Sequence, residues 1–204
     1  MSNNILKTPL KIVCSIPILS ACRGRLDIQF CGRKNKRTNY GLRVAAWNVR
    51  TLLDGDGVPE RRTAIIAREL GRYRIDIAAL SETRLHGETQ VVEVAAGYTF
   101  FCVGSPQGQP AQAGVGFAIR SSLLAQIESS PLGHSTRLMS LLLKLDRSTC
   151  ATLICAYAPT LAADEGVKNE FYEQLEHLIA AVPHKHKLFV LGDFNARVGC
   201  NFMS

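Results

Sequence analysis

The sequence Lys-Leu-Phe-Val-Leu-Gly-Asp-Phe-Asn at residues 187–195 decides the fold class. Its first five residues form a short apolar run, which predicts a buried strand. A glycine, a carboxylate and an asparagine (Gly192, Asp193 and Asn195) then follow the strand. Open α/β sheets place their ligand sites at the carboxyl ends of strands. We therefore expect this segment to carry polar groups into a functional site.

Strands and helices are predicted to alternate along the chain before this segment. Apolar runs predict strands at residues 42–49, 75–80, 98–103, 114–119, 137–145 and 149–157. Helical spacing predicts one helix that begins near Pro59 and another at 164–182. The order β-α-β-β-β-β-β-α-β indicates a mixed sheet with helices, and hence an α/β or α+β fold.

The positive charge is concentrated at the N-terminus. Residues 1–40 contain eight Lys or Arg and one acid, so they account for the net charge of +7. The remaining residues contain sixteen basic and sixteen acidic side chains, which cancel. We predict a basic, disordered tail at 1–41 and one folded domain at 42–204. The tail could bind nucleic acid, direct nuclear import, or be incidental sequence.

The cysteine pattern and the hydropathy of the sequence indicate the cellular compartment of the protein. The seven cysteines form no Cys-x-x-Cys pair and no zinc-like spacing with histidine, which indicates a reducing compartment. No stretch approaches the roughly 18 apolar residues of a membrane span. We expect an intracellular protein of the nucleus or cytoplasm, and the basic, acid-poor N-terminus leaves a mitochondrial location open.

Polar side chains gather at four predicted strand ends. If the strands lie in register, Asn48, Glu82 and Asp193 converge on one pocket, with Tyr157 ending another strand. An asparagine, two carboxylates and a phenol suit Mg²⁺, which takes oxygen ligands and retains waters for a phosphate substrate. Metal-assisted attack of water on phosphorus needs a Lewis acid, a carboxylate that orients the water, and hydrogen-bond donors.

Five motifs occur together in a recognisable order. They are Trp47-Asn48-Val49, Leu80-Ser81-Glu82-Thr83, Gly114-Val115-Gly116-Phe117-Ala118-Ile119, Tyr157-Ala158-Pro159 and Gly192-Asp193-Phe194-Asn195. Their order and spacing resemble the endonuclease/exonuclease/phosphatase superfamily. Residues 47–52, 137–140 and 195–199 look closer still to the endonuclease domains of non-LTR retrotransposons, and to craniofacial development protein 2-like proteins that derive from such elements.

The resemblance implies a two-sheet α/β sandwich that hydrolyses DNA phosphodiester bonds with Mg²⁺, or with Mn²⁺ in its place. By position, Glu82 resembles the principal metal ligand. Asn48 would either hold metal-bound water or hydrogen-bond to a residue that binds the metal. Tyr157 would donate to the scissile phosphate or leaving oxygen. Asp193 would orient or deprotonate the attacking water, and Asn195 would steady the phosphate and Asp193.

Two departures from the family pattern shape the expected activity. Arg50 stands where other members carry an acid. The later strands, with a Ser-Asp-His or similar segment, have no counterpart in these 204 residues, so we expect a sandwich without its last strands. Such a fold predicts impaired catalysis and association through the incomplete sheet. The alternative is a non-catalytic remnant that binds nucleic acid or protein, or one with no function.

Ordinary structural roles remain open for each candidate residue. Glu82 could be a surface acid, Tyr157 an edge aromatic, and Asp193 with Asn195 an Asx turn. Arg137 could contact phosphate or simply be a solvated strand-start arginine. An inositol-phosphate or lipid substrate would keep the same fold, but the retroelement-like residues around Asn195 disfavour it.

Overall fold

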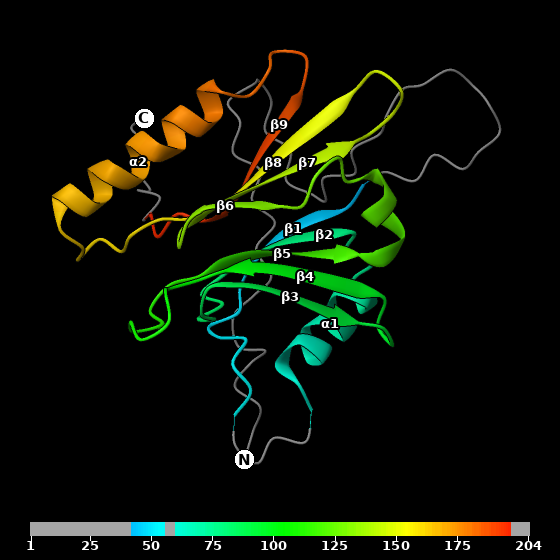
Figure 1. The fold of residues 1–204 in the computed structure, drawn as a ribbon, viewed down its shortest axis with the longest axis horizontal. Coiled ribbons are helices and arrows are strands. Elements are labelled where there is room, and N and C mark those ends of the chain that lie inside the picture. The colour runs from blue at the N-terminus through cyan, green and yellow to red at the C-terminus, as the bar shows by residue number, and fades with distance from the viewer. Residues whose placement is uncertain (1–41, 56–59, 197–204) are drawn as a thin grey trace, which may run out of the picture.

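The protein is a sandwich of two mixed sheets with a helix on each outer face (Figure 1). The computed structural model describes residues 42–55 and 60–196. The first sheet has the strand order β1-β2-β5-β4-β3 and the second β6-β7-β8-β9. The bounds of the first sheet's strands are β1 Val44–Asn48, β2 Ile77–Ser81, β3 Glu88–Glu93, β4 Tyr98–Val103 and β5 Val115–Arg120. Those of the second are β6 Leu132–Ser135, β7 Leu138–Lys144, β8 Cys150–Tyr157 and β9 Lys187–Asp193.

The main core lies between the two sheets. It contains fully buried side chains of β5, β7 and β8, among them Phe117, Leu141 and Leu153. Alternate residues of each strand face this layer, because side chains of a strand point to opposite sides in turn. Two buried cysteines, Cys102 and Cys155, lie in the cores, as expected for small apolar side chains.

Each helix covers the outer face of one sheet. Helix α1 (Arg62–Arg72) buries Ile66 and Leu70 against the first sheet, and α2 (Glu165–Ala180) buries Phe171 against the second. Asp164 caps α2, since its Oδ1 accepts a hydrogen bond of 2.7 Å from the amide of Gly166. A 3-10 helix, η2 (Ser121–Gln126), follows β5. Within the described ranges, no helix is long and apolar enough to span a membrane.

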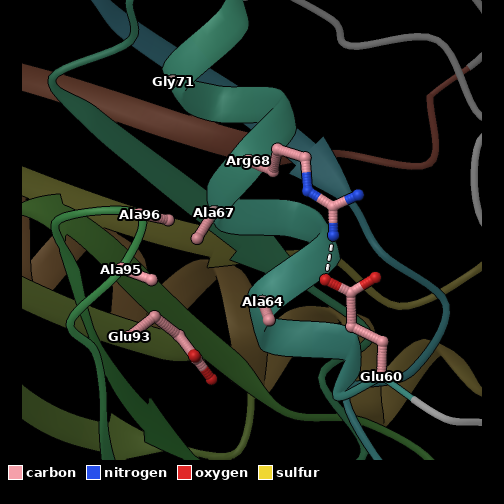
Figure 2. Close-up of a pocket in the computed structure, with 8 residues that line it drawn as sticks. All are labelled: Glu60, Ala64, Ala67, Arg68, Gly71, Glu93, Ala95 and Ala96. Carbon is pink, nitrogen blue, oxygen red and sulfur yellow. Dashed lines mark hydrogen bonds and ion pairs between the residues drawn. The ribbon is translucent and has the colours of Figure 1, made fainter.

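Small side chains line a groove of about 310 Å³ beside α1, shown in Figure 2. Ala64 and Ala67 of the helix face Ala95 and Ala96 of the β3–β4 turn, and the ion pair of Arg68 with Glu60 lies at one side. The strand register places the β3–β4 turn at the opposite end of the sheet from the carboxyl ends of β1 and β2. The groove is therefore remote from the predicted site.

The predicted two-sheet α/β sandwich is confirmed, with two strands that the sequence order omitted. These are β3, which pairs with β4 at the edge of the first sheet, and the short β6, which pairs with β7. Residues 145–149 join the antiparallel strands β7 and β8 as a hairpin. The helix expected near Pro59 begins at Arg62, and Pro59, the basic tail and residues 197–204 lie outside the described residues. The described residues do not test the expectation that the sandwich lacks its last strands, which stays a prediction.

Candidate active site

Two parallel strand pairs deliver polar side chains to one end of the sandwich. In the first sheet β1 pairs with β2, which sets Asn48 opposite Ser81 and places Glu82 directly after it. In the second sheet β8 pairs with β9, which sets Tyr157 opposite Asp193. Parallel neighbours end at the same edge of a sheet, so each pair contributes two polar residues to that edge. The packing of the two sheets then brings the pairs together.

A single amide group joins the two carboxylates. Asn48 Nδ2 donates to Glu82 Oε1 at 2.7 Å and to Asp193 Oδ2 at 3.1 Å. The two carboxylate oxygens therefore lie within about 6 Å of each other, since one nitrogen reaches both. Asn48 Oδ1 accepts from the backbone amide of Arg50 at 3.1 Å, which holds the amide in this orientation. The predicted convergence of three residues from three strands is thus present.

Tyr157 completes the cluster from the second sheet. Its hydroxyl donates to the same oxygen, Glu82 Oε1, at 3.2 Å. Burial raises the pKa of Tyr157, and the negative charge of Glu82 and the hydrogen bond to it raise the pKa further, while Arg137 opposes the shift. The phenol therefore keeps its proton at neutral pH and remains a hydrogen-bond donor.

Glu82 lies on an unusual stretch of backbone. Glu82 and Arg84 have φ angles of 56° and 55°, in the left-handed region that few non-glycine residues adopt. This conformation turns the chain so that Arg84 Nη2 meets Glu82 Oε2 at 3.2 Å. Backbone of this kind tends to occur at functional sites, where the surrounding structure enforces it. Arg84 was not among the predicted site residues.

The end of β9 and the residues that follow it are fixed by three local features. Gly192 has a φ of 152°, and a Cβ there would lie 1.7 Å from the carbonyl oxygen of Ala156, so only glycine fits. Asn195, with a φ of 46°, donates from its backbone to Asp193 Oδ1 at 3.1 Å and from Nδ2 to Ala158 O at 2.7 Å. Asp193 is thereby held through both carboxylate oxygens.

Arg137 lies against Tyr157 rather than in open solvent. Its Nη1 donates to the carbonyl oxygen of Tyr157 at 3.2 Å, and its Cζ lies 4.9 Å from the centroid of the tyrosine ring. Such stacking of a guanidinium on an aromatic face is attractive. Arg137 thus brings a positive charge next to the cluster, as a phosphate contact would require.

The chain matches the model of the Endonuclease/Exonuclease/phosphatase family over residues 45–202, which is more than half of its length. The chain belongs to this family. Members are nuclease- or phosphatase-type hydrolases of phosphodiester bonds, and they generally use divalent metal ions, commonly Mg²⁺.

Relatives and solved structures agree with this family assignment. The chain is 30% identical over 156 residues to craniofacial development protein 2 of Tragulus javanicus and of Bos taurus. The match covers 76% of this chain but only 25% and 24% of those proteins. A humanised Danio rerio TDP2 crystal structure has a TM-score of 0.50 at 16% identity, with coverage of 76% of this chain and 66% of that one. That likeness shows the fold.

The side chains at the strand ends suit the metal ions that this family uses. Mg²⁺ is commonly held by one or two carboxylates together with waters and substrate phosphate oxygens. Glu82 and Asp193 are the carboxylates of the cluster, and each retains free lone-pair positions after its hydrogen bonds. Among the described residues no group of three or more His, Cys, Asp or Glu side chains gathers, so an all-protein cage is absent there. The donor set fits a Mg²⁺ site that leaves coordination positions for water and for phosphate oxygens of the substrate.

Three described histidines have partners elsewhere. His134 Nε2 lies 2.8 Å from Ser140 Oγ, His86 Nδ1 lies 3.3 Å from the carbonyl oxygen of Pro106, and His186 Nδ1 lies 3.1 Å from Thr152 Oγ1. Burial lowers the pKa of His134. None of these three hydrogen bonds involves Asn48, Glu82, Tyr157 or Asp193.

Proposed function

We propose that this chain carries a Mg²⁺-dependent endonuclease site that hydrolyses DNA phosphodiester bonds. One observation supports the proposal above all others. The Asn48 amide binds the carboxylates of both Glu82 and Asp193, and Tyr157 donates to the same Glu82 oxygen. Four strand ends from two sheets thus form one polar cluster at the edge of the sandwich.

Glu82 is the residue that would hold the metal ion. Its side chain is 19% exposed, so it is sheltered but reachable from solvent. A bound divalent ion supplies Lewis acidity toward a phosphate oxygen and stabilises charge that develops there. Asn48 contributes by keeping the two carboxylates together, which would otherwise repel each other.

Asp193 is the residue that would orient the attacking water. Hydrogen bonds to both of its oxygens, from Asn48 and from the backbone of Asn195, fix the plane of the carboxylate. Each oxygen still has a lone pair that can accept a proton from water. An oriented carboxylate base of this kind serves phosphoryl transfer by positioning the nucleophile.

Tyr157 and Arg137 would bind the phosphate. The phenol stays protonated, and its single O–H, which donates to Glu82 in this structure, would turn to a phosphate or leaving oxygen when substrate binds. The guanidinium stacked on the ring adds positive charge. A positive charge that is already in place stabilises the charge developing in the transition state. The side chain of Asn195 is held by Ala158 O, so it would steady this loop as well as the phosphate.

DNA is the substrate that the sequence favours. The segments around Asn48, Arg137 and Asn195 resemble retrotransposon endonuclease domains more closely than phosphatases of small molecules. The exposed guanidinium groups of Arg50 and Arg84 add to the positive charge near the cluster, as binding to a phosphate backbone requires. A retrotransposon origin and a nuclear or cytoplasmic location are part of this proposal.

A plasmid-nicking assay tests the proposal. Supercoiled plasmid would be incubated with Mg²⁺ and the parent chain, Glu82→Gln, or Glu88→Gln, which changes an exposed glutamate of β3 in the same way. We expect nicking by the parent and by Glu88→Gln, and at least a hundredfold slower nicking by Glu82→Gln. Equal rates for all three proteins would overturn the proposal. DNA binding without any nicking would favour the non-catalytic alternative.

A further inference from the structure

A second hollow lies beside Tyr157, between the β6–β7 turn and helix α2. Its volume is about 170 Å³. The end of β6 and the turn after it contribute Ser135, Thr136 and Arg137, and the helix contributes Val167, Glu170, Phe171 and Gln174. Sites for drug-sized ligands begin at about 300 Å³, so this hollow suits a single ring-sized group.

Arg137 connects this hollow to the candidate active site. The same guanidinium that lines the hollow stacks on the Tyr157 ring at 4.9 Å and donates to the Tyr157 carbonyl. A group bound in the hollow is therefore one side chain away from the tyrosine. In a nucleotide, a single sugar joins the phosphate to its base, so a base can reach the hollow while its phosphate lies at Tyr157.

The lining of the hollow has the character of a base site rather than a second phosphate site. Val167, which is 45% exposed, offers apolar surface to the face of a ring, and the largely buried Phe171 also belongs to the lining. The carboxylate of Glu170 would repel a phosphate. Hydroxyl groups of Ser135 and Thr136 add hydrogen-bonding capacity at the turn. An apolar face with a polar edge matches a nucleobase.

The polar edge favours bases that carry an amino group. Gln174 Nε2 donates to Glu170 Oε1 at 3.0 Å, which ties the two side chains together. The carboxylate retains lone pairs after this bond, and the Gln174 amide oxygen is a further acceptor. Glutamate accepts hydrogen bonds from the N4 amino group of cytosine, whereas thymine presents an O4 acceptor at the same position.

We propose that this hollow receives the base next to the scissile phosphate, and that Glu170 with Gln174 selects cytosine over thymine there. The inference rests on the proposed endonuclease function. It assigns to α2 a role in sequence preference, which a helix that only covers the outer face of a sheet would not have. It also gives a reason for the exposure of Val167 on that helix.

Metal-free binding to short single-stranded DNA tests the inference without any need for catalysis. Fluorescence anisotropy in EDTA would compare dC and dT homopolymers of equal length for the parent, Glu170→Gln and Glu173→Gln. Both glutamates are exposed residues of α2, and Glu173 does not line the hollow, so it is the matched control. We expect the parent and Glu173→Gln to bind dC about tenfold more tightly than dT, and Glu170→Gln to lose this preference.

A steric variant makes the test independent of charge. Val167→Phe adds bulk at an exposed position of the hollow, and it should abolish the dC preference while leaving the melting temperature within about 2 °C of the parent. Equal binding of dC and dT by the parent, or an unchanged preference in both variants, would overturn the inference. Glu82-dependent nicking with no base preference would reject the hollow and keep the proposed function. A base preference without Glu82-dependent nicking would keep the base site in the hollow and reject the proposed function.

Discussion

The substitution Asn48→Asp tests the central geometry of the site most sharply. The amide Nδ2 donates to Glu82 at 2.7 Å and to Asp193 at 3.1 Å. Aspartate has the same shape as asparagine, but it places an oxygen where this donor stands. Two attractive contacts therefore become contacts between negatively charged oxygens, with no change in side-chain volume.

The size of the effect follows from the two bonds. A hydrogen bond to a charged group contributes about 1.5–3 kcal/mol. The cluster is only half-buried, so solvent screens part of the repulsion, and we expect a loss of about 3 kcal/mol in the free energy of unfolding at pH 7. For a domain of this size each kcal/mol shifts the melting temperature by about 2–4 °C, which gives a shift of about 6–12 °C.

A divalent ion should reverse most of this loss. An ion present at a hundred times its Kd stabilises the folded state by about 2.7 kcal/mol, and the variant offers it an additional carboxylate. The assay is thermal unfolding followed by circular dichroism, in EDTA and then in excess Mg²⁺. The control is Asn169→Asp, the same change at an exposed position of α2. A melting temperature of Asn48→Asp equal to that of the control in EDTA would refute the amide bridge.

Three further predictions each concern a substitution at one residue. Tyr157→Phe should lower the single-turnover nicking rate about a hundredfold, because a protonated phenol donor is lost. Gly192→Ala should cost at least about 3 kcal/mol in urea unfolding, since its Cβ would overlap a carbonyl oxygen of the neighbouring strand, whereas Gly97→Ala, with open space at its Cβ, should cost only about 1 kcal/mol. Burial raises the pKa of both Cys102 and Cys155 from 9.0 to about 12, so stability present below pH 9 should be lost as pH rises toward 12. The fall in melting temperature between about pH 9 and 11 should be shallower in a Cys155→Ala variant than in the parent.

Strands with apolar runs could be predicted from the sequence, and strands that depend on their partners could not. β3 (Glu88–Glu93) is an edge strand whose residues are alternately exposed and half-buried, so it lacks a continuous apolar run. β6 (Leu132–Ser135) has only four residues and a turn-like composition. Its Gly133 packs so closely on Val103 that a Cβ would lie 2.9 Å from that side chain. Tertiary contacts, rather than local preference, make these segments strands.

The site was predictable to the extent that it depends on strand ends. Asn48, Glu82 and Asp193 each follow an apolar run, and parallel pairing then brings strand ends to a common edge. The ion pair of Arg84 with Glu82 was not predictable. It depends on positive φ angles at both residues, and neither Glu nor Arg favours that conformation in isolation. The proximity of Tyr157 to Glu82 likewise depends on how the two sheets pack.

Direct measurement of metal binding tests the central claim, that these strand ends hold one divalent ion. Electron paramagnetic resonance reports free Mn²⁺ during a titration, and it needs neither substrate nor catalysis. We predict one Mn²⁺ site per chain in the parent and in Glu88→Gln, competed by Mg²⁺, with affinity reduced at least tenfold in Glu82→Gln. Equal binding by the parent and Glu82→Gln, or no stoichiometric binding by the parent, would contradict the claim.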